Sequence, residues 1–201
     1  NRINTINVAI VKGAVVARDW TFEDANTLEW WDPNDETTVS EVGGEVGSIT
    51  GKINSHSLAQ ANGAKQPNTV TLDSKTALYF DGGDYLKVPN ITLPADGNVA
   101  FYAVVTIDSV SNKNDSIFAM DSDANDFQLE AGATSTFGGK LNGYGLGVTD
   151  FLITGGPYDG TGAHIFATVF DKDSSTLKVF IDGVEVGSSS TYTIPLNTAQ
   201  E

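Results

Sequence analysis

The stretch His164–Gly187, HIFATVFDKDSSTLKVFIDGVEVG, decides the fold class. Its first part, His164–Phe170, is rich in the β-branched and aromatic residues that are enriched in strands. The polar break at Asp171–Ser175 has the composition of a hairpin loop. Leu177, Val179 and Ile181 then alternate with Lys178 and Phe180. Asp182-Gly183 follows and suits a tight turn, because Asp tolerates positive φ and Gly adopts it without strain. We therefore predict a three-stranded antiparallel meander.

The rest of the chain repeats this pattern. Turn signals recur about every ten residues, and no long stretch has helical period. Asn98–Ile107, NVAFYAVVTI, is almost continuously apolar, which is typical of a strand buried on both faces of a sheet. Thr50–Asn68 is polar and is interpreted as a long surface loop, with one helical turn near Ser57–Ala61. The chain is predicted to be all-β, with one antiparallel β-sandwich over residues 21–201.

The first 20 residues allow two interpretations. Ile6–Val11 and Ala14–Ala17 are β-prone runs that Lys12-Gly13 separates. They form either a strand of the same sandwich, for example at its edge, or an N-terminal arm. An arm would pair with a neighbouring subunit, because an unpaired strand is a template for another chain. We expect such an arm to make the protein multimeric.

The composition excludes several classes of function. The chain has 201 residues, no Cys and a formal net charge of −15. The absence of Cys excludes disulfides, thiol nucleophiles and thiolate metal sites. A surface this acidic repels phosphate backbones, so nucleic acid is not an expected partner. No apolar run is long enough to span a membrane and no signal peptide is visible. Because the only Met is Met120, we expect a processed, trimmed or fragmentary chain.

Four segments, in order, carry a family resemblance: Leu28–Val39 (LEWWDPNDETTV), Gln66-Pro67, Ala77–Leu86 (ALYFDGGDYL) and the meander. Together they resemble the laminin-G-like, concanavalin-A-like jelly-roll superfamily, and the bacterial and phage members of it most of all. The resemblance covers roughly residues 28–196. It implies a jelly-roll sandwich on an extracellular or virion surface.

Two departures from the family pattern bear on function. The loop after the Trp segment usually carries a Trp-Lys-Asp-x-Ser-Gly type motif, whereas Ser48–Ser57, SITGKINSHS, stands here. The family also usually ends with a further strand pair, whereas this chain stops at Glu201, just after a predicted strand at Thr191–Leu196. Either that part is missing, which would make the sandwich truncated at its C-terminus, or the N-terminal strand or a partner chain fills its place.

Catalytic residues are not apparent. Hydrolases of the resembled superfamily carry a Glu-x-Asp-x-x-Glu strand, which places carboxylates on one face. Glu41 and Glu45 lack the central Asp and are separated by two glycines. His56 and His164 stand alone in the sequence, and no Gly-x-Ser-x-Gly elbow is present. We therefore expect no enzyme activity, and a glycoside hydrolase is the least favoured alternative.

Metal binding is suggested by one acidic turn. Asp121, Asp123 and Asn125 alternate as oxygen ligands of Ca²⁺ do, although the segment fails the EF-hand pattern. Ca²⁺ is therefore the one cofactor that the sequence suggests. The pair Asp81 and Asp84 is weaker, because in the resembled family this Asp-Gly turn mainly shapes a hairpin.

Glycan binding would need exposed aromatic rings beside polar side chains. Tyr144 and Tyr158 lie in Gly-rich stretches, with Asn142 and Asp159 as polar neighbours. All four also suit a role as packing or loop anchors. Trp30-Trp31 would point to opposite faces of a strand, so one of the two is expected in the core.

These observations favour a non-catalytic structural or adhesion module, such as a virion decoration, fibre or tail-associated domain. The alternative is a Ca²⁺-assisted carbohydrate-binding module of a secreted bacterial enzyme or adhesin, which would bind a surface glycan.

Overall fold

The computed structural model describes residues 2–12, 27–88, 91, 98–109, 115–120, 125–131, 137–143, 151–152, 162–171 and 173–190, and the side chains of 27–88, 91, 98–107, 117, 162–171 and 173–190. These residues are almost entirely strand. The strands are β1 (Arg2–Lys12), β2 (Thr27–Trp31), β3 (Val39–Val42), β4 (Glu45–Thr50), β5 (Ser57–Ala59), β6 (Asn68–Leu72), β7 (Lys75–Phe80), β8 (Val99–Ser109), β9 (Asp115–Met120), β10 (Asn125–Ala131), β11 (Phe137–Gly143), β12 (Phe151–Leu152), β13 (Ala163–Asp171), β14 (Thr176–Ile181) and β15 (Val184–Ser189). A 3₁₀ turn, η1 (Gly63–Lys65), is the helical element of this set. No helix in the described ranges has the length and apolar content to cross a membrane.

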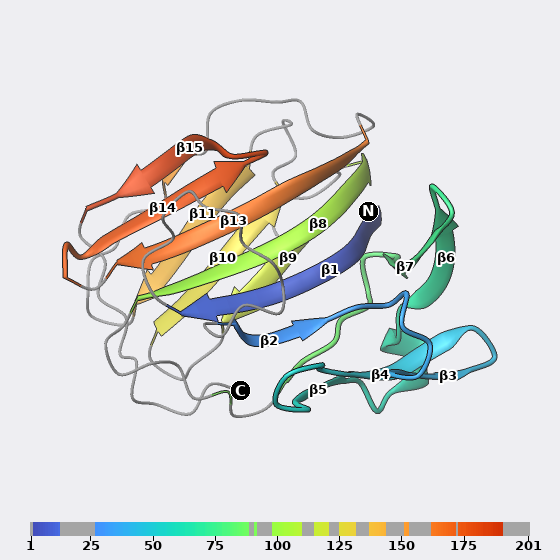
Figure 1. Cartoon of the computed structure of the whole chain (residues 1–201). Coiled ribbons are helices and arrows are strands. Elements are labelled where there is room, and N and C mark those ends of the chain that lie inside the picture. Colours follow the sequence, from blue (N-terminus) through green and yellow to red (C-terminus); the bar gives the residue numbers. More distant parts are fainter. Residues whose placement is uncertain are drawn as a thin grey trace.

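The strands form two antiparallel sheets. The larger sheet has the order β15-β14-β13-β8-β1-β7-β6-β4-β3, with β2 paired to β1 and β5 paired to β4. The smaller sheet has the order β12-β11-β10-β9. Figure 1 shows β9, β10 and β11 in a layer behind β8 and β13, and Ile117 of β9 packs against the core. The predicted antiparallel β-sandwich is confirmed.

The predicted meander is present as β13, β14 and β15. The turn between the last two strands has positive φ at Asp182 (51°) and Gly183 (81°), as a tight hairpin requires. Leu177, Val179 and Ile181 are buried, so the alternation read from the sequence marks the face that packs on the core. The meander prediction is confirmed.

The core lies on one face of β8 and its neighbours. Phe101 and Val105 of β8 join Phe166 and Phe170 of β13 in the main cluster of buried residues. The rings of Phe101 and Phe170 meet edge to face, with 5.8 Å between their centroids. On the opposite face of β8, Tyr102 is only partly exposed. This agrees with the continuous apolar sequence of the strand.

The first strand, β1, lies inside the larger sheet. One of its edges pairs with β8 along almost its whole length, from Arg2↔Ser109 to Lys12↔Val99. The other edge pairs with β7 near Ile3–Thr5 and with β2 near Val8–Val11. Residues 2–12 are thus a strand of the same sandwich, the first interpretation above, and an interior strand rather than an edge strand or a free arm.

The segment predicted as a loop over Thr50–Asn68 is more ordered than expected. The segment contains β5, which pairs with the preceding strand β4, and Ala59 of β5 forms a further bridge with Lys87. The expected helical turn near Ser57–Ala61 is wrong, because Ser57–Ala59 are extended and the helical turn comes later, at η1. These strands gather at one end of the molecule with β2 and β3 (Figure 1).

Candidate functional site

A buried carboxylate organises the end of the molecule that carries β2. Glu29 lies on β2 and is 0 % exposed. Its oxygens accept hydrogen bonds from the backbone N–H groups of Ile53 (2.8 Å), Asn54 (3.0 Å) and His56 (3.0 Å). The His56 ring nitrogen Nδ1 lies 3.0 Å from the same carboxylate, and the Trp30 N–H lies 3.3 Å away. The donors together compensate for the removal of this charge from water.

Apart from the Trp30 N–H, the donors belong to one short loop, Gly51–His56, that closes over β2. A Cβ at Gly51 would lie 2.2 Å from Cδ of Glu29, so only glycine leaves room for the carboxylate. Ser55 has a φ of 60°, in the left-handed region, which turns the chain back toward His56. The indole N–H of Trp31 donates to the carbonyl of His56 at 2.8 Å. Glu29 and Trp31 thus both hydrogen-bond to this loop and hold it against β2.

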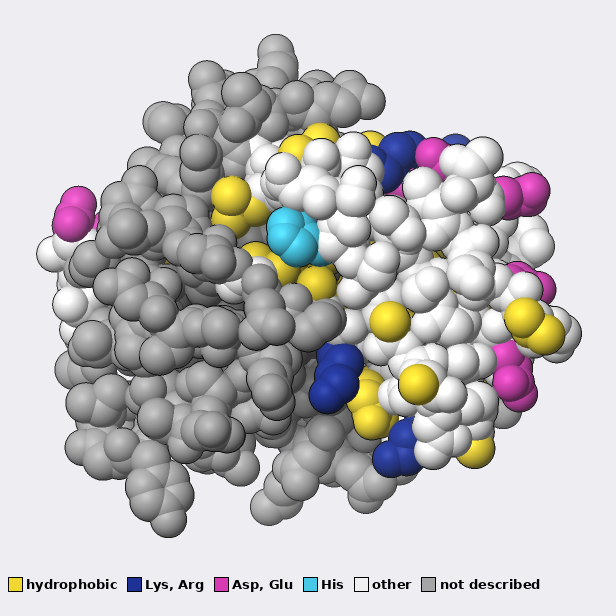
Figure 2. Space-filling view, turned by 90° about the horizontal axis from the view of Figure 1, so that it is seen from below, with side chains coloured by type: hydrophobic (Ala, Val, Ile, Leu, Met, Phe, Trp, Pro, Cys, Tyr) yellow, Lys and Arg dark blue, Asp and Glu magenta, His cyan; other side chains and the backbone are white. Residues whose placement is uncertain are grey.

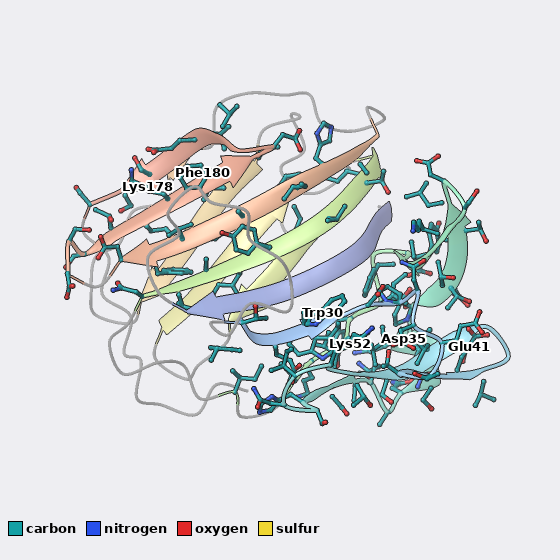
Figure 3. The ribbon with its side chains drawn as sticks, in the orientation of Figure 1. Trp30, Asp35, Glu41, Lys52, Lys178 and Phe180 are labelled. Carbon is teal, nitrogen blue, oxygen red and sulfur yellow. The ribbon has the colours of Figure 1, made fainter. Side chains whose placement is uncertain are left out.

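Lys52 extends from this loop onto the outer side of β2. Its ammonium lies 4.7 Å from the centroid of a Trp30 ring and 2.8 Å from a carboxylate oxygen of Asp35. Figure 3 shows these three side chains close together near β2. The hydrogen bonds from Lys52 and Thr37 lower the pKa of Asp35 from 3.8 to about 2. Trp31 belongs to the main core cluster, whereas Trp30 is buried outside that cluster, at 8 % exposure.

Lys52 gives a first testable prediction. The pKa of Asp35 lies below its ordinary value in the folded chain, so the interaction stabilises the fold above pH 3.8 and is lost as the pH falls toward about 2. Lys52→Met should raise this pKa toward 3.8, stopping short of it because Thr37 still donates. Carboxyl NMR titration measures the value. Lys178→Met, at a separate exposed ion pair with Glu185, is the matched control. An Asp35 pKa that stays near 2 in Lys52→Met would contradict the assignment.

An exposed aromatic ring forms a second feature, next to η1. Tyr85 is 43 % exposed, and the ammonium of Lys65 lies 5.4 Å from its ring centroid. The hydrogen bond with the Gln60 side chain, followed by the charges of Lys65 and Lys87, lowers the pKa of the Tyr85 hydroxyl. Figure 2 views the molecule from below, where basic and hydrophobic side chains lie next to one another. We call Tyr85, Gln60, Lys65 and Lys87 the Tyr85 platform.

The turn before Tyr85 brings two carboxyl groups together. Asp84 accepts a hydrogen bond from the N–H of Asp81, and Asp81 accepts one from the N–H of Gly83. Burial, and then the nearby Asp81 and Glu45, raise the pKa of Asp84. In the part of the chain that the structure describes, no three His, Cys, Asp or Glu side chains could share a metal ion. These acids hydrogen-bond within the turn, but the described residues that follow it do not pair with β7, so the hairpin that the resemblance implied is not formed here.

His164 lies at the start of β13 and contacts the hairpin turn of the meander. Its Nδ1 is 2.6 Å from Oδ2 of Asp182, whose other oxygen accepts the N–H of Ile165 at 2.9 Å. Burial of Asp182 acts to raise its pKa, but the bonds to His164 and Ile165 outweigh it and lower the pKa overall. The contact ties the turn to β13, which fits a structural role for His164.

The predicted ligand residues fall mostly outside the described residues. This applies to Tyr144, Tyr158 and Asp159, and to the metal candidates Asp121 and Asp123. The backbone of Asn125 begins β10 and that of Asn142 lies on β11, where Asn125 pairs with Gly143 and Asp126 with Asn142. These two positions therefore lie at the same end of one hairpin.

Sequence reasoning missed Glu29 and the Tyr85 platform. A signal existed for Tyr85, which lies in the quoted segment ALYFDGGDYL directly after a turn. A signal for Glu29 was weaker, because a charged residue between apolar neighbours on a strand reads as one that faces solvent. Its donors lie 24 to 27 positions further along the chain.

Comparison with known families gives one match. The model of the family described as Laminin_G_3, concanavalin A-like lectin/glucanases superfamily, matches residues 80–201. These residues contain β8 to β15, whereas β1 to β6 precede the match. No curated protein matches the chain. The family resemblance read from the sequence is confirmed.

Proposed function

Because the chain belongs to the concanavalin A-like lectin/glucanases superfamily, we propose that it is a non-catalytic structural or adhesion module, displayed on an extracellular or virion surface. The superfamily unites lectins with glucanases, so the choice between binding and hydrolysis has to come from the residues. An acidic, Cys-free chain with a formal charge of −15 suits a solvated surface module.

The observation that carries the proposal is the use of the carboxylates. Glu29 is enclosed by a loop, Asp35 is paired with Lys52, and Asp182 closes a hairpin. Asp81 and Asp84 hydrogen-bond within a single turn, whereas glycosidases hold two carboxyl groups about 5–9.5 Å apart across the sugar. Each of these acids builds structure, which supports a role without bond cleavage.

Assembly with a larger protein belongs to the same proposal. The pairing of β1 on both edges leaves no open strand there, so we assign the contact to the ends of the larger sheet. Of the described strands, β3 pairs only with β4 and β15 only with β14. Val42 on β3 is 82 % exposed and Val184 on β15 is 64 % exposed. Such edges accept a strand or loop of a partner.

Two measurements test this function. Incubation with a panel of polysaccharides should release no reducing ends, and release that Asp84→Asn abolishes would overturn the non-catalytic assignment. Chemical crosslinking of the full chain in its native assembly should link residues of β3 or β15 to a neighbouring protein. Crosslinks confined to the chain itself would overturn the assembly role.

A carbohydrate-binding module is the second candidate, and the Tyr85 platform favours it. An exposed ring beside an amide and ammonium groups offers a surface for sugar C–H groups and donors for hydroxyls. Neither Lys65 nor Lys87 forms an ion pair with a described residue. Tyr144, Tyr158, Asn142 and Asp159 remain candidates for the same ligand, with Ca²⁺ at Asp121, Asp123 and Asn125.

This candidate predicts that Tyr85→Ala weakens glycan binding at least about tenfold, or about 1.4 kcal/mol, because the stacking surface is lost. Binding is measured on a glycan array with and without Ca²⁺, and affinities by titration calorimetry. Val42→Ala, which removes exposed apolar surface elsewhere, is the control and should bind as wild type. If no glycan on the array binds, the carbohydrate-binding candidate is rejected. If Tyr85→Ala binds glycan with unchanged affinity, the binding site does not include the Tyr85 platform.

A further inference from the structure

The loop Gly51–His56 has the geometry of an anion-binding site. The backbone N–H groups of Ile53, Asn54 and His56 converge on one carboxylate at 2.8–3.0 Å. Backbone N–H groups that converge in this way, often around a residue in the left-handed region, form concave sites for anions. Ser55 supplies that residue here. The loop therefore holds an anion through three backbone N–H groups, and the His56 ring nitrogen Nδ1 adds a side-chain contact at 3.0 Å.

The anion in this site comes from a different part of the chain. The carboxylate belongs to Glu29 on β2, 24 residues before Ile53. The side-chain stem of Glu29 serves to hold the carboxylate in place, while the loop recognises only its two oxygens. The loop donors would meet the same two oxygens on an unattached carboxylate.

The space at the site is matched to one planar carboxylate. A Cβ at Gly51 would lie 2.2 Å from Cδ and 2.4 Å from Oε1 of Glu29, so the floor of the site already touches the group. Glu29 is 0 % exposed, so the carboxylate is fully enclosed by the surrounding residues. Replacing Glu29 by Ala removes Cγ and the carboxylate, which are together the heavy atoms of acetate.

We propose that Gly51–His56 is a carboxylate-binding site, occupied in the native chain by Glu29, that takes up a free small carboxylate once the Glu29 side chain is shortened. Occupancy orders the loop and with it the position of Lys52 above Trp30. The site is independent of the surface role proposed above.

The full chain carrying Glu29→Ala tests this with sodium acetate as the probe. The midpoint temperature of thermal unfolding should rise with acetate concentration, by about 5–10 °C at a hundredfold excess of acetate over its Kd. Sodium chloride and sodium sulfate at matched ionic strength should not reproduce the shift. Wild type, whose site is filled, and Val179→Ala, a core variant in β14, are the controls and should not respond to acetate. In ¹H–¹⁵N spectra of Glu29→Ala, the amides of Ile53, Asn54 and His56 should shift with acetate.

An equal response to all three salts, or amide shifts that avoid the loop, would overturn the proposal. If Glu29→Ala folds only in acetate, the requirement for acetate itself supports it. If Glu29→Ala is unfolded in every salt, Glu29→Asp provides the test instead. Its side chain is shorter by one methylene, which withdraws the carboxylate from the loop N–H groups. Amide exchange at Ile53, Asn54 and His56 should then be at least tenfold faster than in wild type, and unchanged exchange would overturn the proposal.

Discussion

Glu29→Gln should lower the free energy of unfolding by about 3 kcal/mol, a loss typical of breaking a buried, fully hydrogen-bonded charged group. The substitution keeps the size of the side chain and turns one acceptor oxygen into an NH₂ donor. That donor then faces backbone N–H groups of Gly51–His56, which are donors themselves, at a side chain that is 0 % exposed. Urea unfolding, followed by fluorescence, measures the loss.

Glu41→Gln is the matched control. Glu41 lies on the edge strand β3, well apart from Lys52 (Figure 3), and its exposed carboxylate accepts one hydrogen bond from Thr69. Glu41→Gln should change the free energy of unfolding by no more than about 0.5 kcal/mol, as most surface substitutions do. If Glu29→Gln lowers the free energy of unfolding no more than Glu41→Gln does, the loop does not depend on the carboxylate.

Ala9→Pro should destabilise the protein by about 3 kcal/mol or more. Ala9 lies where β1 pairs with β8 on one edge and with β2 on the other, opposite Tyr102 and Trp30. Proline removes the backbone donor and does not fit the interior of a sheet. Thermal or urea unfolding of the full chain measures the effect.

Ala9→Ser keeps the backbone N–H and the approximate size, so it separates the backbone effect from a side-chain effect. It should lose far less than the proline variant. Proline at a residue of an unpaired arm would change the stability by no more than about 0.5 kcal/mol, so a small loss in Ala9→Pro would contradict the interior position of β1.

The sequence predicted the local features of the fold well. The meander depends on short-range signals, and the turn at Asp182-Gly183 has the positive φ angles that its composition required. The alternation of Leu177, Val179 and Ile181 identified the buried face of β14 because side-chain direction in a strand follows from residue parity. Such features are set by neighbouring residues, which is why one sequence suffices to read them.

Features set by distant residues were harder to predict. The sequence indicated that the first residues are β-prone, but two of their three partner strands, β7 and β8, begin more than 60 residues later. Strand pairing over such distances leaves no periodic trace in either segment. The same holds for Glu29, whose burial depends on a loop that only the folded chain brings to it.

The ligand residues predicted from the sequence stay predictions, and the exposed tyrosine that the structure describes was not among them. Tyr85, next to Gln60, is exposed on the surface. Exposure of an aromatic ring depends on what packs around it, so composition alone could not rank Tyr85 above other tyrosines. Glycine-rich surroundings favoured Tyr144 and Tyr158, which lie outside the described residues.

The central claim of the account is that the chain's own first strand completes the larger sheet, and a disulfide tests it most directly. The chain has no Cys, so Ala9→Cys with Tyr102→Cys introduces the only two thiols, at directly opposed positions of β1 and β8. After oxidation, non-reducing gels and peptide mapping should show a monomer with an intramolecular Cys–Cys bond. Disulfide-linked dimers, or thiols that stay free, would contradict the claim.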